Sequence, residues 1–327
     1  AASAGNHAQG VALASRLLKM KATLVMPEGT PINKILSVKR YGANVVLHGD
    51  NFDDAFKYAS VIEKKSKMNL IHAFNDESII AGQGTIGLEI IDALSDVDVV
   101  LVPVGGGGLV SGIAVAIKAI KPDTKIIGVE AKSVPSMSTS LKENKITESK
   151  SSKTIADGIA IKKVGDITFR IAQKLLDDMI LVTEREIEEA LMILASKKRL
   201  IVEGSGAVGL AGLLKRKKSF RGKNTVIIVS GGNIDINVLG RIIDRGLKKD
   251  GRIMNLQIEL PDIPGALGEL STLLGELKAN IIEIFHDRLE MDLPLDIAYV
   301  KIKLETRSFE HQEEIKKNLK KKNYKIV

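Results

Sequence analysis

Short apolar runs alternate with longer amphipathic stretches along most of the chain. Nearly continuous runs of Val, Ile and Leu predict strands buried on both faces, and apolar residues spaced three or four apart predict the helices between them. The expected strands lie at 23–26, 44–47, 69–74, 97–104, 125–129 and 225–229. The expected helices lie at 10–20, 31–41, 53–65, 79–94, 109–120 and 183–198, and residues 131–164 are expected to be irregular. This alternation predicts an α/β fold with parallel sheets covered by helices.

The alternation of single strands and helices changes after about residue 250. Strands are expected there at 253–260, 280–288, 297–304 and 324–327, and helices at 264–277 and 309–321. The order βαββαβ is that of a ferredoxin-like unit. We therefore expect a first domain over residues 1–250, with a small lobe over about 1–75 and a large lobe over about 76–250, and a second domain over 251–327.

The composition removes several classes of function. The chain has no Cys, which excludes disulfides, thiolate metal sites and a Cys nucleophile. Only 3% of its residues are aromatic and Trp is absent, which argues against a stacking surface for nucleic acid. The formal net charge of +8 comes from Lys and Arg residues spread along the chain, and no apolar run reaches membrane length. We therefore expect a cytoplasmic protein that acts on small molecules, with no nucleic-acid or membrane partner.

A run of four glycines follows the expected strand 97–104 and precedes an expected helix. Because glycine has no Cβ, backbone N–H groups there can approach an anion closely, and the helix N-terminus adds partial positive charge. A phosphate cradle is therefore expected at Gly105, Gly106, Gly107, Gly108 and Leu109. A nicotinamide-dependent dehydrogenase stays open as an alternative, because Glu130 imitates its ribose-binding acid, although Val110 stands where its fingerprint requires glycine.

Two further turns carry small polar residues where ligands bind. Ser3-Ala4-Gly5-Asn6-His7 lies at a helix start, where N–H donors suit a carboxylate and Asn6 can reach a phenolic oxygen. Ser230-Gly231-Gly232-Asn233 directly follows strand 225–229, at the strand end where parallel sheets bind ligands, and its Ser hydroxyl can bond a ring nitrogen. Taken singly, each is also compatible with an ordinary turn. The five His residues are scattered, so a His-built metal site or a Ser-His-Asp triad has little support.

In their order and spacing, these turns resemble those of the threonine dehydratases (threonine ammonia-lyases), which are fold-type II enzymes dependent on pyridoxal phosphate. The resemblance covers nearly the whole chain. Ala81-Gly82-Gln83-Gly84-Thr85 is similar to a further stretch of that family. Residues 253–327, with Leu260-Pro261-Asp262-Ile263-Pro264-Gly265-Ala266-Leu267, resemble its ACT-type regulatory domain. The resemblance implies two parallel-sheet lobes with covering helices, followed by a ferredoxin-like ACT-type domain.

The resemblance also implies a role for each turn. The N–H groups of Ser3–His7 would hold the substrate carboxylate, Asn6 would also bond the cofactor's ring hydroxyl, the glycine loop would hold its phosphate, and Ser230 would face its pyridine nitrogen. The implied reaction is β-elimination of L-threonine to 2-oxobutanoate and ammonia, or of L-serine to pyruvate, in amino-acid metabolism such as isoleucine biosynthesis. The implied assembly is a homo-oligomer, a dimer or tetramer, with an allosteric amino-acid effector at the ACT-type domain.

Three features refine what the resemblance implies. The Schiff-base lysine would lie upstream of Ala1, so we expect a chain truncated at its N-terminus that lacks the catalytic lysine; a non-catalytic amino-acid sensor is the alternative. Ala4 stands where serine racemases of the same fold carry a serine, which favours elimination, with serine racemase or serine dehydratase kept as alternatives. Glu130 matches one ligand of the family's divalent-cation site, but Ser136 stands where a second acid is expected, so the metal site is left open.

Overall fold

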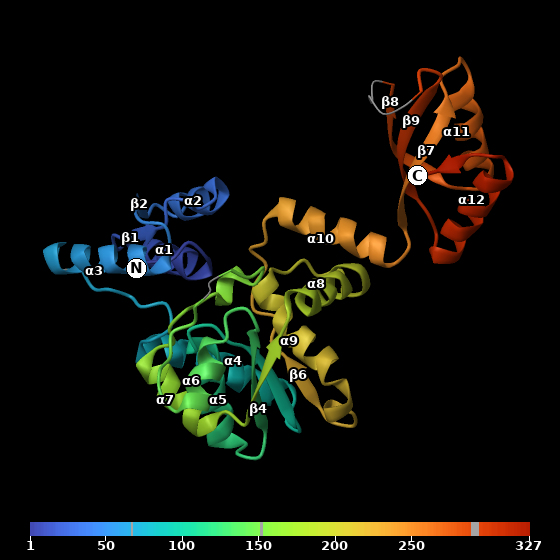
Figure 1. Ribbon diagram of the computed structural model, residues 1–327. Helices are drawn as coiled ribbons and strands as arrows, with labels where there is room; N and C mark the ends of the chain where they lie inside the picture. The colour runs from blue at the N-terminus through green and yellow to red at the C-terminus, as the bar shows by residue number, and fades with distance from the viewer. Residues whose placement is uncertain (67, 151–152, 289–293) are drawn as a thin grey trace. The chain divides into compact units, whose positions relative to one another are not determined.

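The structure, a computed structural model, describes residues 1–66, 68–150, 153–288 and 294–327 (Figure 1). Its contacts divide the chain into two compact units, Ala1–Asp235 and Ile236–Val327. The division assigns the helix after Asp235 to the second unit. Among the described residues, no helix combines the length and apolarity needed to cross a bilayer.

The first unit begins with a small parallel sheet of two strands, β1 and β2. Apolar side chains from α1, α2 and β1 share one buried cluster, and Leu24 and Met26 of β1 are fully buried in it. The amphipathic pattern of the sequence therefore predicts this part well. Its elements are α1 (Asn6–Leu17), β1 (Thr23–Met26), α2 (Ile32–Lys39), β2 (Asn44–Leu47) and α3 (Phe52–Ser66).

A four-stranded parallel sheet of order β5-β4-β3-β6 follows in the same unit. Helix α5 packs against β3, α4 and α7, whereas α9 packs against all four strands and α8. The two groups of helices lie on either side of β4 in Figure 1. The strands are β3 (Val99–Pro103), β4 (Lys125–Ala131), β5 (Asp178–Val182) and β6 (Thr225–Ile227). The helices are α4 (Glu77–Ala93), α5 (Gly108–Ile120), α6 (Ser136–Glu143), η1 (Asp157–Ile159), α7 (Asp166–Leu175), α8 (Glu184–Ile193), η2 (Leu194–Lys198), α9 (Gly204–Lys215) and η3 (Lys217–Phe220).

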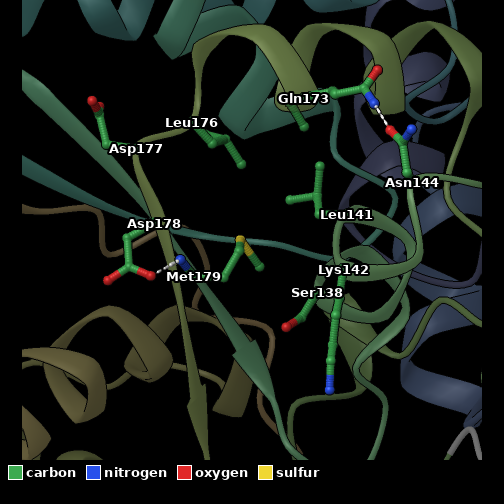
Figure 2. Close-up of a pocket in the computed structure, with 10 residues that line it drawn as sticks. Ser138, Leu141, Lys142, Asn144, Gln173, Leu176, Asp177, Asp178 and Met179 are labelled. Atoms are coloured by element: carbon green, nitrogen blue, oxygen red, sulfur yellow. Dashed lines mark hydrogen bonds between the residues drawn. The ribbon is translucent and has the colours of Figure 1, made fainter.

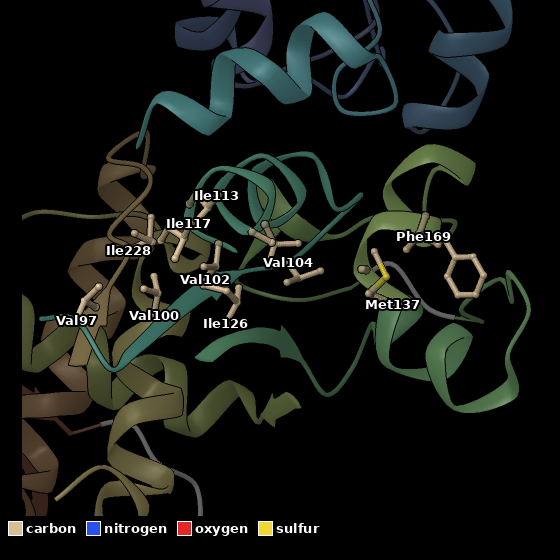
Figure 3. Close-up of a cluster of buried hydrophobic side chains, with 14 residues drawn as sticks. Val97, Val100, Val102, Val104, Ile113, Ile117, Ile126, Met137, Phe169 and Ile228 are labelled. Carbon is tan, nitrogen blue, oxygen red and sulfur yellow. The ribbon is translucent and has the colours of Figure 1, made fainter. Parts of the chain in front are cut away.

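The core of the larger sheet fixes β3 and α5, the elements on either side of the glycine run. Valines of β3 lie together with Ile113 and Ile117 of α5 and Ile126 of β4 (Figure 3). Helix α4 approaches α5 closely because glycines face each other at the crossing: a Cβ on Gly112 would lie 2.3 Å from the Ile80 carbonyl oxygen. The run Gly105–Gly108 thus leaves a rigid strand and enters a rigid helix.

The second unit contains a four-stranded antiparallel sheet of order β10-β7-β9-β8. Its element order βαββαβ confirms the predicted ferredoxin-like topology. The buried faces of α11 and α12 and one face of the sheet form its core. The elements are α10 (Ile236–Lys249), β7 (Ile253–Pro261), α11 (Ala266–Glu276), β8 (Asn280–Asp287), β9 (Ile297–Glu305), α12 (Phe309–Lys321) and β10 (Lys325–Ile326).

Three expectations about local structure differ from what the structure shows. Residues 69–74 form no strand, because His72 Nδ1 accepts the N–H groups of Phe74 (3.2 Å) and Asn75 (3.0 Å) and turns the chain towards α4. The segment 131–164 is not uniformly irregular, since it contains α6 and η1; residues 151–152 lie outside the described part. The expected helix 183–198 ends as an α-helix at Ile193 and continues as the π-helical turn η2.

Candidate active site

One cavity in the first unit brings the predicted turns together. Its volume is about 480 Å³, and residues 3–7, residues 105–109 and Ser230 all line it. Gln83, from the further stretch 81–85, also lines it. The segments that the sequence singled out are far apart in the chain, so their meeting at one cavity is a property of the fold.

The first turn is held at the carboxyl end of β1. Ala2 forms a parallel bridge with Val25, and Ser3 donates its backbone N–H to the Val25 carbonyl oxygen at 3.1 Å. The Gly5 N–H donates to Ser3 Oγ at 3.1 Å. The N–H groups of Ser3 and Gly5 are therefore already used. The expectation that all five N–H groups of this turn are available is wrong for these two. Among the described residues, the N–H groups of this turn that donate to no other protein group are those of Ala4, Asn6 and His7.

The His7 ring anchors the start of α1. Its Nε2 lies 3.3 Å from the Ile71 carbonyl oxygen, in the segment that joins α3 to α4. Burial lowers the pKa of His7, so the ring is neutral at pH 7 and donates through Nε2 to that oxygen. The ring therefore has a structural partner, and His7 contributes its backbone N–H to the cavity.

The glycine loop presents consecutive unused amides at the N-terminus of α5. The N–H groups of Gly105–Leu109 donate to no protein group in the described part of the chain. Gly107 has φ +94°, in the left-handed region that favours glycine, and a Cβ there would lie 2.7 Å from Met137 Cε. Adjacent free N–H groups at a helix start form a site for an anion such as phosphate. The loop therefore has the geometry of an anion site, and its role as a phosphate cradle stays a prediction.

The loop is glycine-rich for a second reason, which is packing. A Cβ on Gly106 would lie 2.4 Å from the Phe74 ring, and one on Gly108 would lie 2.9 Å from Phe74 Cα. The Gly106 carbonyl oxygen accepts a hydrogen bond from Thr168 Oγ1 at 2.7 Å. Phe74 and Thr168 thus fix the loop on two sides, and side chains at these glycines would clash with protein rather than with solvent.

The third turn follows β6 and contributes free polar groups. Ser230 lines the cavity with an exposed side chain. Asn233 also lines it, and its Nδ2 is a buried nitrogen without a hydrogen-bond partner among the described residues. A buried amide without a partner costs free energy, and a bound ligand can remove that cost. Polar ligand atoms are therefore expected at this end of the cavity.

Sequence reasoning missed several cavity residues. Glu203 lies before α9 with only 8% of its surface exposed, and Ser205 is 2% exposed. Lys34 of α2 and Asp157 of η1 form an ion pair of 3.1 Å at the cavity wall. The small residues that directly follow Glu203, Gly204-Ser205-Gly206-Ala207, are a signal for the start of a helix that packs closely on the sheet. No local pattern marks Lys34 and Asp157, because they meet only through the fold.

Glu130 is buried, and its carboxylate caps a helix. One oxygen accepts the N–H of Met137 at 2.9 Å and the other that of Ser138 at 3.0 Å, at the start of α6. Ser136 Oγ lies 3.3 Å from the carboxylate. Burial raises the pKa of Glu130 to about 7 despite these hydrogen bonds. No group of three acidic or His side chains suited to a cation exists among the described residues, so a metal role for Glu130 stays a prediction.

A second cavity of about 400 Å³ lies beside α6, α7 and β5 (Figure 2). Gln173 donates to Asn144 across its wall, and the Met179 N–H donates to Asp178 at 2.7 Å. None of the predicted site residues lines this cavity. Its lining residues are Ser138, Leu141, Lys142, Asn144, Ala172, Gln173, Leu176, Asp177, Asp178 and Met179.

Comparison with known proteins finds relatives over nearly the whole chain. A family described as pyridoxal-phosphate dependent enzyme matches residues 1–231. An L-threonine ammonia-lyase of Thermotoga maritima is 46% identical over 326 residues, which is 100% of this chain and 81% of the relative. The processed form of threonine deaminase isoform 2 from Solanum lycopersicum superimposes with a TM-score of 0.72 at 44% identity, over 74% of this chain and 68% of that one.

A serine racemase is also similar in structure. The maize enzyme superimposes with a TM-score of 0.69 at 34% identity, over 76% of this chain and 77% of its own. The family match covers the glycine loop and the first two residues of the third turn, and it ends before the second compact unit begins. The chain therefore belongs to the family of pyridoxal-phosphate dependent enzymes, in the fold-type II group that includes the threonine ammonia-lyases.

Proposed function

We propose that the protein catalyses the β-elimination of L-threonine to 2-oxobutanoate and ammonia, and of L-serine to pyruvate, with pyridoxal phosphate as cofactor. The observation that carries this proposal is the meeting of three separate turns at one cavity. Support comes from relatives named as threonine ammonia-lyases at 46% identity. A nicotinamide-dependent dehydrogenase, left open by the glycine run alone, has no comparable support.

The residues present fit the cofactor. The free N–H groups of Gly105–Leu109 would hold its phosphate, Asn6 its ring hydroxyl and Ser230 its ring nitrogen. The unpaired Asn233 Nδ2 supplies a further donor. When bound, pyridoxal phosphate supplies an electron-withdrawing ring that stabilises negative charge at the substrate Cα.

The chain's own groups orient the substrate and limit the chemistry. The N–H groups of Ala4, Asn6 and His7 bind the substrate carboxylate at the helix N-terminus, which fixes the amino acid by one end. The Ser230 hydroxyl is a weaker proton partner for a ring nitrogen than a carboxylate would be, so a ring bound there would stay largely unprotonated. This arrangement favours reactions in which a β-hydroxyl leaves quickly over reactions that need a long-lived carbanion.

The proton transfer at Cα requires a base, which we assign to the Schiff-base lysine expected upstream of Ala1 in the intact protein. Lys34 does not take this role, because its Nζ donates to Asp157 at 3.1 Å. Proton abstraction by a lysine requires a free amine.

Racemisation is a second candidate function, favoured by the structural similarity to maize serine racemase. Ala4 lines the cavity without a hydroxyl that could deliver a proton to the opposite face of the substrate. We therefore rank elimination first. Replacement of Ala4 by Ser is expected to add measurable D-serine formation, and unchanged product with L-serine would argue against this role for the position.

We further propose that the second unit is an ACT-type regulatory domain and that the protein is a cytoplasmic homo-oligomer, a dimer or tetramer. Gly265, at φ +95°, precedes α11 and leaves the start of that helix open to an amino-acid carboxylate. Asp262 beside it accepts two hydrogen bonds from Arg288, at 2.9 and 2.7 Å. An effector that binds there with different affinity in two states would regulate elimination, as expected for isoleucine biosynthesis.

The direct test is product analysis with the intact protein. Incubation with pyridoxal phosphate and L-threonine is expected to release equal amounts of 2-oxobutanoate and ammonia, and L-serine is expected to give pyruvate. Chromatography of the products and an ammonia assay measure this. Absence of product from both amino acids, despite bound cofactor, would reject the proposal and favour the non-catalytic sensor.

A further inference from the structure

Glu203 is a buried acid in the cavity wall without a role in the reaction described above. It lies directly before α9, and 8% of its surface is exposed. A buried carboxylate is retained at a site when its oxygens have partners. Its contacts are therefore informative about what it does.

The Glu203 side chain reaches the first turn. Oε1 accepts the Asn6 amide Nδ2 at 3.5 Å, and it also accepts the buried Ser205 hydroxyl. Asn6 and Glu203 are 197 positions apart in the sequence. At 3.5 Å the contact is a long hydrogen bond. It fixes which end of the Asn6 carboxamide faces the acid, because a carboxylate oxygen accepts a hydrogen bond from the nitrogen and repels the amide oxygen.

The Glu203 backbone and side chain also contact the third turn. The Glu203 N–H donates to the Gly231 carbonyl oxygen at 3.0 Å. A Cβ on Gly231 would lie 2.3 Å from Glu203 Oε1, so this turn closes tightly on the acid. Gly231 directly follows Ser230. One residue thus links the turn assigned to the ring hydroxyl with the turn assigned to the ring nitrogen.

We infer that Glu203 is a positioning residue for the cofactor ring, which acts by fixing the Asn6 carboxamide so that an N–H and not the carbonyl faces the ring hydroxyl. This inference rests on the proposed function, which assigns that hydroxyl to Asn6. Nδ2 carries two hydrogens: Glu203 accepts one, and the other stays available to the ring oxygen. A donor at this place stabilises the ionised form of the ring hydroxyl.

The test compares two probes on the holoenzyme and its variants. Pyridoxal phosphate has the ring hydroxyl, and 3-deoxypyridoxal 5′-phosphate lacks it. Glu203→Asp shortens the side chain, so the carboxylate moves away from Asn6 while the negative charge stays. Glu203→Gln keeps the length of the side chain and removes the charge. We expect the dissociation constant for pyridoxal phosphate to rise about tenfold in E203D, which is about 1.4 kcal/mol, and about threefold in E203Q. We expect the visible absorption band of the bound cofactor to weaken in both.

The analogue separates positioning from structural damage. Its dissociation constant is expected to be the same in the wild type and both variants, because the group that Asn6 contacts is missing. Glu184→Gln is the matched control: Glu184 also accepts a serine hydroxyl, from Ser133 at 2.7 Å, and does not line the cavity. It is expected to leave binding of both probes and the visible band unchanged.

Three results would contradict the inference. Equal weakening for both probes in E203D and E203Q would show a structural role, and unchanged binding of pyridoxal phosphate would show that Glu203 does not act on the ring. In either case the wild type binds the cofactor and the proposed function stands. A wild type that does not bind pyridoxal phosphate would reject the proposed function, and the inference with it.

Discussion

At the scale of single residues, Glu130 links pH to stability. Its folded-state pKa is raised by burial from 4.5 to about 7, so the folded chain binds a proton more tightly than the unfolded chain. Its contribution to stability is fully present below pH 4.5 and is lost as pH rises through about 7. The unfolding free energy should fall by up to about 1.4 kcal/mol per pH unit in this window from this group alone.

Urea unfolding of the wild type and Glu130→Gln at several pH values between 5 and 8 measures this contribution. The variant cannot ionise, so its unfolding free energy is expected to fall less steeply with pH than that of the wild type. Parallel curves for the two proteins would show that Glu130 does not titrate in this window.

Gly107 is the residue of the glycine loop whose backbone conformation depends most on the absence of a side chain. Gly107→Ala places a Cβ at φ +94°, 2.7 Å from Met137 Cε and 2.9 Å from Thr168 Cβ. We expect a loss of about 2 kcal/mol in unfolding free energy and at least tenfold weaker binding of pyridoxal phosphate. Gly10→Ala is the control: a Cβ at Gly10 in α1 meets nothing within 4 Å, so stability should rise slightly. Normal cofactor binding by the Gly107 variant would show that the loop tolerates another conformation.

Lys34 lines the cavity but is not expected to carry the cofactor. Its Nζ donates to Asp157 at 3.1 Å, so the side chain is directed to that carboxylate. Borohydride reduction of residues 1–327 mixed with pyridoxal phosphate, followed by peptide mass mapping, should give no adduct concentrated at Lys34. A single adduct at Lys34 together with turnover would remove the need for a lysine upstream of Ala1.

At the scale of elements, the crossing of α4 and α5 depends on glycine. A Cβ on Gly112 would lie 2.3 Å from the Ile80 carbonyl oxygen and 2.6 Å from the Gly84 nitrogen, and both atoms belong to rigid backbone. Gly112→Ala should therefore lower the unfolding free energy by about 3 kcal/mol. Gly82→Ala, on the same α4 with nothing within 4 Å of its Cβ, should raise it by about 0.5 kcal/mol. Chemical unfolding of both variants checks the pair, and similar values would contradict close packing.

The elements that the sequence predicts well are those with their own local signals. Thr183 and Glu186 form a capping box at the start of α8, a local pattern of the predicted helix 183–198, and the Val/Ile run of β3 is buried along its whole length. Helix α6 was missed because its cap is distant: the carboxylate of Glu130 binds the first N–H groups of that helix. Residues 69–74 have a strand-like composition, but the ring of His72 binds the following backbone N–H groups instead.

The difference between local signals and distant contacts also explains how much of the site could be predicted from the sequence. Its backbone parts are recognisable because glycine and small residues are required locally, as at Gly107 with its positive φ. Glu203 and Asn6 could not be paired from the sequence, since nothing local relates residues that are 197 positions apart. Positioning contacts of this kind depend on how the two sheets are brought together.

At the scale of the whole molecule, the chain should behave as two folding units. The contacts separate Ala1–Asp235 from Ile236–Val327, and each unit has its own buried core. Calorimetry is expected to show two transitions, of which only that of the first unit shifts upwards with pyridoxal phosphate. Saturation at a hundred times the dissociation constant stabilises the binding unit by about 2.7 kcal/mol. One transition that shifts as a whole would show that the two units unfold cooperatively.

The unused amides of Gly105–Leu109 have a consequence for experiments that search for this site by mutation. Main-chain donors survive every side-chain truncation, so a scan that replaces charged residues by alanine would give no signal at the proposed phosphate contact. The attraction is also largely dipolar, with no Lys or Arg among these five residues, so ionic strength should affect it weakly. Insertion of one residue within the run would move every donor at once and is the sharper genetic probe.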